Sequence, residues 1–182
     1  MRRTIEFSSS FFIFLAVLLL ILPFPLALSF LAASIIHELG HIAAIISMKI
    51  PIHTVTLTCT GAQNATAPMR PNQELLAACG GPLAGICLTF LFPFLPFVAL
   101  FAAGQTVFNL LPVMPFDGGR IVRILAQKHL GARQHILCRF AEIVTYGLLM
   151  LFALILAGIK LWLSVPVLLL TLRLMSKKAF IS

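Results

Sequence analysis

Three residues in an apolar stretch have types and a spacing that suit metal-dependent hydrolysis. His37, Glu38 and His41 form the pattern His-Glu-Leu-Gly-His, inside an apolar run from Phe11 to Met48 that has no other charge. On a helix, residues i and i+4 share a face, so both imidazoles can bind one metal ion while the carboxylate accepts a proton from water. An ionised group inside a membrane is costly and indicates a functional site. The sequence therefore predicts a zinc hydrolase centre within the membrane.

A third zinc ligand is expected from the acidic residues. A catalytic zinc commonly has three protein ligands and an open fourth position. Glu6, Glu74 and Glu142 fall at expected helix ends, where interfacial roles suffice, whereas Asp117 lies in a helix break rich in Pro and Gly. A carboxylate at this position is explained if a bound metal ion neutralises its negative charge. Two His with one Asp are a ligand set that suits zinc. We therefore predict one Zn²⁺ per chain, bound by His37, His41 and Asp117.

Simpler interpretations of these residues exist. His-Glu-x-x-His is short enough to arise by chance, and in a membrane span it can be a hydrogen-bonded polar cluster between helices. An Asp before Gly-Gly often only forms a turn. Asn109 can simply bond a neighbouring helix, but its position one helical turn before the break favours a role in the site. The pairing of the two motifs favours the metal site.

Composition indicates a membrane protein. The chain has 182 residues, of which 60% are hydrophobic and 10% charged, against roughly 25% charged in soluble domains. The four cysteines have no C-x-x-C spacing, so we interpret them as reduced small hydrophobes. Basic residues are scattered at expected helix ends, so nucleic acid is not an expected partner. We predict a single domain over 1–182.

Apolar segments and Pro or Gly breaks predict an all-α polytopic protein with about six transmembrane helices. A short amphipathic helix at the membrane surface is expected over 120–139. The expected spans are 9–24, 27–48, 75–92, 97–112, 140–158 and 161–176.

A short membrane-associated strand or hairpin is expected between the second and third helices. Residues 53–60 alternate Thr with Val, Leu and Cys, which is a strand pattern, and Gly61 can end it. We expect an unwound substrate segment to pair with the edge of this strand, which makes Thr56 and Thr58 candidate substrate-binding residues. The alternative is a solvated loop that tethers the two helices.

Charge asymmetry predicts the orientation. Six spans place both termini on one side, and if that side is cytoplasmic, twelve of the 13 basic residues lie inside and only Lys160 outside. The inside set is Arg2, Arg3, Lys49, Arg70, Arg120, Arg123, Lys128, Arg133, Arg139, Arg173, Lys177 and Lys178. This orientation places both motifs at the cytoplasmic face of a multi-pass cell-membrane protein.

The sequence resembles the site-2 protease family of intramembrane zinc metalloproteases. The resemblance rests on H-E-L-G-H in the second span, N-L-L-P-V-M-P-F-D-G-G ending the fourth, and Gly80-Gly81-Pro82-Leu83-Ala84-Gly85 in the third. The closer likeness is to the sporulation branch that processes a sigma-factor precursor. The resemblance implies that His37, His41 and Asp117 bind zinc, that Glu38 activates water, and that Asn109 holds substrate or the oxyanion.

Two departures bear on regulation. The sporulation branch usually continues into a cytoplasmic CBS domain, whereas this sequence ends at Ser182, and there is no inserted PDZ domain. The expected function is regulated intramembrane proteolysis. Expected partners are a membrane-embedded or membrane-associated protein substrate and the lipid bilayer, with a regulatory membrane protein as a further candidate. The alternatives are a metal transporter and a catalytically silent relative that binds membrane partners.

Overall fold

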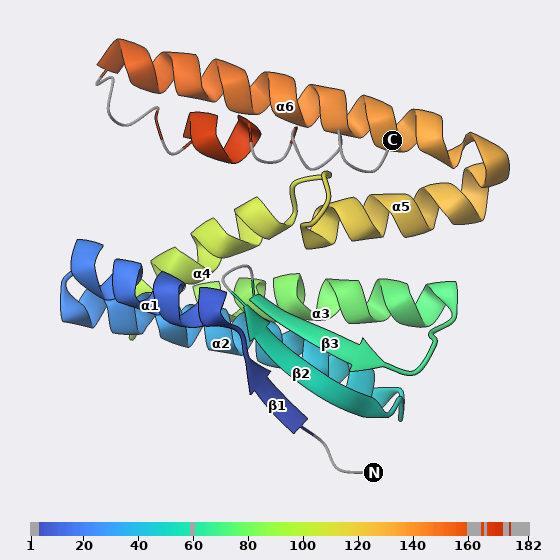
Figure 1. Cartoon of the computed structure of the whole chain (residues 1–182), viewed down its shortest axis with the longest axis horizontal. Coiled ribbons are helices and arrows are strands. Elements are labelled where there is room, and N and C mark those ends of the chain that lie inside the picture. Colours follow the sequence, from blue (N-terminus) through green and yellow to red (C-terminus); the bar gives the residue numbers. More distant parts are fainter. Residues whose placement is uncertain (1–3, 59–60, 160–164, 166, 173–174, 176–182) are drawn as a thin grey trace. The chain divides into compact units, whose positions relative to one another are not determined.

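The computed structural model describes residues 4–58, 61–159, 165, 167–172 and 175 (Figure 1). Contacts between residues divide the chain into two compact units, 1–110 and 111–182, and each is described by itself. A single domain over 1–182 stays a prediction. The first unit contains β1 (Thr4–Phe7), α1 (Ser9–Ile21), α2 (Phe24–Ser47), β2 (Ile52–Thr58), β3 (Gly61–Thr66), α3 (Pro71–Thr89) and α4 (Pro96–Asn109). The second contains α5 (Asp117–Leu130), a 3-10 turn η1 (Gly131–Arg133) and α6 (Gln134–Ile159).

Prolines set the first turns of three helices in the first unit. Pro25, Pro71 and Pro96 occupy the first or second position of α2, α3 and α4, respectively. Proline suits these positions because its missing N–H would have no intrahelical partner there and its φ angle is already helical. Pro23, which precedes α2, separates it from α1 where the sequence predicted a break.

The end of α2 is closed by the backbone. The Ile50 amide donates to the Ile45 carbonyl at 3.3 Å, and the Lys49 amide donates to the Ile46 carbonyl at 2.8 Å. Lys49 has a φ of 56°. This pair of bonds with a left-handed residue is the Schellman arrangement, which satisfies carbonyls at the helix end. Helix α2 therefore stops just before Pro51, and the chain enters β2.

Helices α2 and α3 pack with their backbones in close approach. A Cβ atom added to Gly40 would meet the Gly80 carbonyl oxygen and lie 2.6 Å from the Ala84 Cβ. A Cβ atom added to Gly80 would lie 2.5 Å from the Gly40 carbonyl oxygen. Small residues at such crossings let membrane helices approach closely. Helix α4 completes this group through an apolar cluster of Ala33, Leu88 and Ala102.

The sheet has three strands in the order β1-β2-β3. Strand β1 is parallel to β2, with Glu6 opposite Thr56, and β3 is antiparallel to β2, with Thr58 opposite Gly61. The expected strand and hairpin between the second and third helices are therefore confirmed. A free strand edge at Thr56 is not available, because Thr56 is paired with Glu6 of β1 on one side and with Gln63 of β3 on the other. Thr58 is paired with β3 alone. Substrate binding by these two residues stays a prediction. The outward edges belong to β1 and β3.

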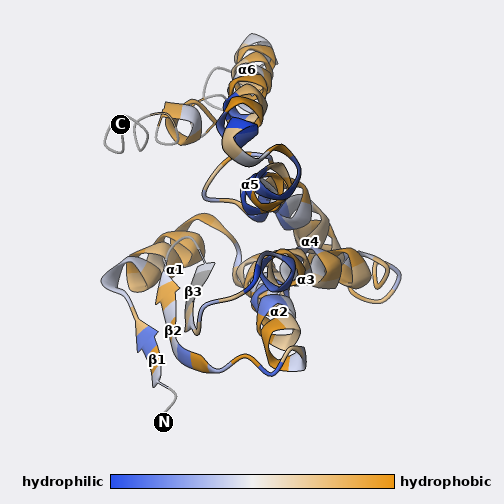
Figure 2. Cartoon of the chain, turned by 90° about the vertical axis from the view of Figure 1, so that its right-hand side faces the viewer, coloured by the Kyte–Doolittle hydropathy of each residue, from blue (hydrophilic) through white to orange (hydrophobic). Residues whose placement is uncertain are grey.

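The second unit is built from two successive helices. Gly131, with a φ of 50°, ends α5, so the expected surface helix over 120–139 is shorter than predicted and its last residues belong to α6. Figure 2 shows hydrophilic residues concentrated on α5, whereas α6 is hydrophobic along most of its length. Val113 and Leu149 form a buried apolar cluster that joins the loop before α5 to α6.

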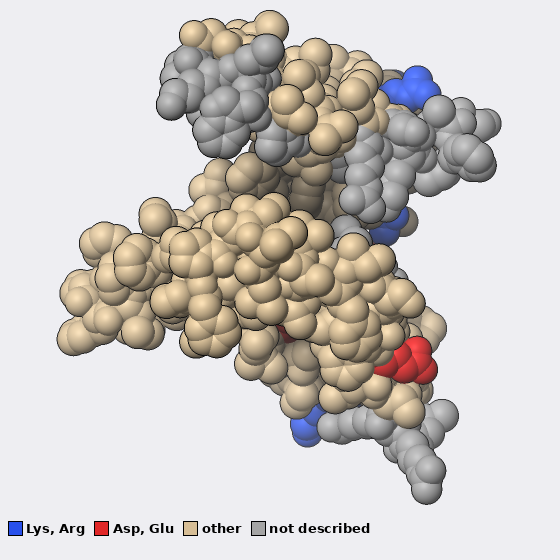
Figure 3. Space-filling model, turned by 60° about the vertical axis from the view of Figure 1, so that its left-hand side comes forward, with Lys and Arg blue, Asp and Glu red and all other residues tan. Residues whose placement is uncertain are grey.

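Two helical stretches, Phe24–Ser47 and Asp117–Ile155, are long and apolar enough to cross a membrane by length and composition, and Ser9–Ile21 is a shorter apolar helix. Charged side chains are sparse on the face shown in Figure 3. Six spans stay a prediction. Half of the expected sixth span, 161–176, lies outside the described residues.

Candidate metal centre

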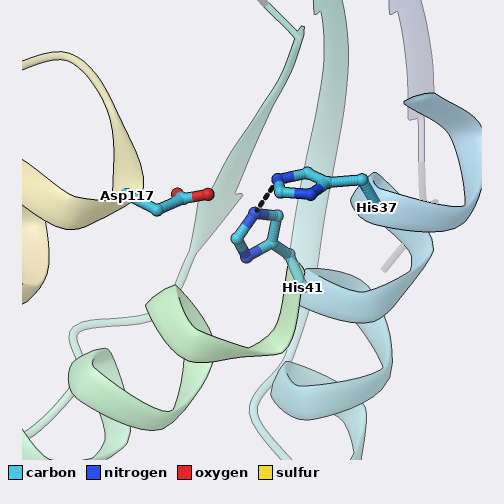
Figure 4. A group of neighbouring side chains, drawn as sticks. All are labelled: His37, His41 and Asp117. Carbon is cyan, nitrogen blue, oxygen red and sulfur yellow. Dashed lines mark hydrogen bonds between the residues drawn. The ribbon is translucent and has the colours of Figure 1, made fainter. Parts of the chain in front are cut away.

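Two buried imidazoles on α2 face one another. His37 and His41 lie one turn apart, as the i, i+4 spacing predicts, and both are buried. Their Nε2 atoms are 3.3 Å apart, and the ring planes are at 79° (Figure 4). Two metal-ligand atoms from one helix therefore point into the same small space.

The tautomer of His41 is fixed by the backbone of α3. The Nδ1 atom of His41 lies 2.8 Å from the Ala77 carbonyl oxygen and 3.3 Å from the Gly81 amide nitrogen. A carbonyl oxygen can only accept, so the shorter contact requires a proton on Nδ1. A neutral His41 then presents the Nε2 lone pair toward His37. Metal-binding histidines typically have such a backbone partner on the other ring nitrogen.

The separation of the two Nε2 atoms fits a shared zinc ion. In a tetrahedral site with Zn–N bonds of about 2.0–2.1 Å, two ligand nitrogens lie about 3.3–3.4 Å apart. The observed separation, 3.3 Å, falls in that range. Two imidazole nitrogens in a buried site are also a donor set that zinc prefers. The histidine pair therefore passes this test as part of a zinc site.

Gly81 leaves the space in front of the imidazoles open. A Cβ atom added to Gly81 would meet His41 Nε2 and would lie 2.6 Å from His37 Nε2. Any other residue at this position would fill the space toward which both lone pairs point. Gly81 was noted in the sequence only as part of a family-like motif. A Gly-Gly pair inside an apolar helix is unfavourable for the helix and so signals a close approach.

Asn109 reaches the same place from α4. Its Nδ2 atom lies 3.3 Å from His37 Nε2, so an amide N–H points at the imidazole edge of the site. Asn109 is the last residue of α4, directly before the break that was seen in the sequence. Asn109 thus lies beside His37, and its role in holding substrate or the oxyanion stays a prediction.

Glu38 is half-buried beside Gly61, the first residue of β3. A Cβ atom added to Gly61, whose φ is 112°, would lie 2.5 Å from Glu38 Oε1. The Thr58 hydroxyl donates to the Gly61 carbonyl at 2.9 Å and so closes this end of the hairpin. The carboxylate expected to act as a base thus lies against the first residue of β3. No simple sequence signal links Gly61 to Glu38, because the contact depends on how the hairpin returns to α2.

Asp117 is the first residue of α5 and is buried. A carboxylate in the first turn is stabilised by the positive end of the helix dipole. Gly119 belongs to the same turn, and a Cβ atom there would meet the Val113 carbonyl carbon and lie 2.6 Å from the Met114 amide nitrogen. The Pro- and Gly-rich loop thus folds back on the helix start. Asp117 belongs to the second unit and the two histidines to the first, so its role as the third metal ligand stays a prediction.

Comparisons with known proteins add independent information. Residues 89–156 match the profile of Peptidase family M50. That segment contains Asn109 and Asp117 but neither of the two histidines. The fold is similar to that of a site-2 protease from Methanocaldococcus jannaschii, with a TM-score of 0.61, 24% sequence identity, and coverage of 92% of this chain and 85% of that one. No curated protein matches the sequence. At this identity the structural similarity shows the fold, and the M50 match supports metallopeptidase chemistry.

Proposed function

We propose that this protein is an intramembrane zinc metalloprotease that hydrolyses peptide bonds of membrane-embedded or membrane-associated substrates. The observation that carries the proposal is the pair of buried imidazoles, His37 and His41, with Nε2 atoms 3.3 Å apart in a space that Gly81 leaves open. The M50 match and the site-2-protease-like fold support the same class of protein. The likeness to the sporulation branch stays a prediction.

In this proposal His37, His41 and Asp117 hold one zinc ion. The bound metal would supply Lewis-acid activation of water and of the scissile carbonyl. Ala77 holds the His41 ring in place through its carbonyl oxygen, at 2.8 Å from Nδ1. Two neutral imidazoles and one carboxylate leave the site with one net positive charge, which favours an incoming carbonyl oxygen.

Glu38 is the proposed general base and acid. Its carboxylate takes a proton from water and later gives it to the leaving amine, which requires that one residue reach both sides of the scissile bond. Asn109 can donate from Nδ2 to the oxygen on which negative charge develops, because its amide already lies 3.3 Å from His37 Nε2. Both residues come from helices of the first unit, so their mutual placement is set within that unit.

The substrate must be extended and held near these groups. Backbone exposed at membrane depth is tolerated only against protein or in a water-lined cavity. Because β2 is central, we propose that an unwound substrate segment pairs with the outward edge of β1 or β3. Thr56 and Thr58 would then act through the sheet that they hold together, with Thr58 also closing the turn beside Glu38.

A single-span substrate reconstituted with the protein in vesicles tests the proposal. Removal of zinc with a chelator should abolish cleavage, and added zinc should restore it, with about one zinc bound per chain. A variant with both His37→Ala and His41→Ala should lose the bound zinc. Cleavage that persists in zinc-free protein, or unchanged zinc content in the double variant, would exclude this function. The metal-transporter and silent-relative alternatives predict no cleavage at any zinc concentration.

A further inference from the structure

A second polar contact joins α2 to α4 next to the metal centre. The Gln105 amide donates from Nε2 to the Ser34 hydroxyl at 2.8 Å and to the Phe30 carbonyl at 3.3 Å. The Ser34 hydroxyl in turn donates to the Phe30 carbonyl at 2.9 Å. The proposed chemistry uses none of these residues. A glutamine is costly in an apolar helix unless its amide is bonded, so this contact needs an explanation.

The Gln105 contact lies in register with the contact of Asn109. Gln105 and Asn109 are four residues apart on α4, and their partners Ser34 and His37 are three residues apart on α2. Residues at these spacings lie on one face of a helix, one turn apart. The two contacts therefore lie one helical turn apart along α2 and α4, which run in the same direction. The Gln105 contact sets the position of α4 along the axis of α2, and this position decides whether the Asn109 contact can form.

Apolar packing alone does not fix the position of α4 along α2. The interface also contains an apolar cluster of Ala33, Ala102 and, from α3, Leu88, and the rings of Phe30 and Phe101 meet edge to face at 5.5 Å. Aromatic pairs tolerate centroid separations of about 4.5–7 Å, so this contact restricts the position of α4 less than a hydrogen bond does. In lipid there is also no hydrophobic driving force between helices. A directional hydrogen bond from Gln105 to Ser34 does select one position of α4 along α2.

We infer that Gln105 and Ser34 are positioning residues, which hold α4 in the register that places the Asn109 amide at His37. This inference rests on the proposed function, because it assigns a step to Asn109. Loss of the Gln105 bond lets α4 shift, and a shift of about 1 Å in a catalytic group can lower a rate by about a hundredfold. The zinc ligands themselves do not depend on Gln105, so metal content is unaffected.

A double-mutant cycle tests the inference in the reconstituted protein. Gln105→Met and Ser34→Ala should each lower kcat about tenfold to a hundredfold with little change in KM and in zinc content. In a background of Asn109→Ala, Gln105→Met should cause no further loss, because Gln105 acts through Asn109. Ser34→Thr, which keeps the hydroxyl, should restore kcat. Ser29→Ala is the matched control, since the Ser29 hydroxyl bonds only the Pro25 carbonyl of its own helix.

Equal losses from Gln105→Met with and without Asn109 would overturn the inference, because they would indicate a merely structural effect. So would wild-type kcat in Gln105→Met. A second readout does not need activity. In a background without the native cysteines, cysteines at Ala33 and Ala102 should form a disulfide more slowly when Gln105→Met is added, whereas Ser29→Ala should have no effect. Unchanged cross-linking overturns the inference even if no substrate is cleaved, and absent cleavage by the wild type refutes the proposed function separately.

Discussion

At the residue scale, the backbone of α3 shapes the space in front of the two imidazole rings. The Ala77 carbonyl fixes the His41 ring, and Gly81 leaves room where both Nε2 lone pairs point. That the two imidazoles face one another could be predicted from the sequence, because the i, i+4 spacing is local. The roles of Ala77 and Gly81 could not, because they depend on how close α3 approaches α2, and a backbone carbonyl carries no signal in its residue type.

Gly81→Ala should weaken zinc binding, since the new methyl group occupies the space between the imidazoles. Loss of a hydrogen-bond partner of a metal ligand typically lowers metal affinity about 10–100-fold. A methyl group that clashes directly with the imidazoles should lower zinc affinity at least as much. The measurement is zinc affinity by competition with a chromophoric chelator. Gly85→Ala is the control one turn along the same helix, where a Cβ atom would meet Thr106 Oγ1 and not the histidines. Equal zinc affinity in both variants would contradict the assigned role of Gly81.

At the element scale, the position of the metal-bearing helix depends on its crossing with α3. Gly40 lies between His37 and His41 in the sequence and contacts the backbone of Gly80 on the neighbouring helix. The same turn of α2 thus carries the two imidazoles and a close backbone contact with α3. Overpacking this crossing should therefore disturb both the stability and the site.

Gly40→Ala should lower the free energy of unfolding by about 1–3 kcal/mol, because the added methyl group would overlap the Gly80 carbonyl oxygen and crowd the Ala84 Cβ. Unfolding in detergent, followed by circular dichroism, measures the change. Gly147→Ala on α6 serves as control, because a Cβ atom there meets nothing within 4 Å. It should be neutral or stabilise the helix by up to about 1 kcal/mol. A Gly40→Ala protein as stable as the control would refute the tight crossing.

The elements themselves differ in how well the sequence predicts them. Apolar runs and prolines predict α1, α2 and α4 to within a few residues. Strand β1 escaped prediction because its four residues pair with β2, some 50 positions away in the register Thr4 to Thr54, and nothing local signals that pairing. Strand β3 has the sequence Gly-Ala-Gln-Asn-Ala-Thr, whose strand propensity is low, so it forms only because β2 pairs with it.

At the scale of the whole molecule, basic residues should set the orientation in the membrane. Twelve of 13 lie in segments expected inside, among them Arg70, directly before α3, and Arg133, at the end of η1. Lys160, the one basic residue expected outside, lies outside the described residues. The two helical stretches able to span a membrane are consistent with a membrane location, whereas the number of spans and the direction of insertion stay predictions.

Cysteine labelling checks the orientation. On a background without the four native cysteines, a cysteine placed near Arg70 or Arg133 should be labelled by an impermeant reagent from the cytoplasmic side. A cysteine near Lys160 should be labelled from the outside. The reverse pattern would mean that the termini and the metal centre face the exterior, contrary to the positive-inside rule.

Hydrolysis by the wild type and by Glu38→Gln, both loaded with zinc, tests the central claim most directly. The amide cannot accept a proton from water, so cleavage of a single-span substrate should fall by at least about 10²–10⁴-fold, while zinc content and the unfolding midpoint stay the same. Mass spectrometry of the products measures the rate and locates the cut. Cleavage by Glu38→Gln near the wild-type rate would contradict the account, because the catalytic base would then lie outside the His-Glu-Leu-Gly-His turn of α2.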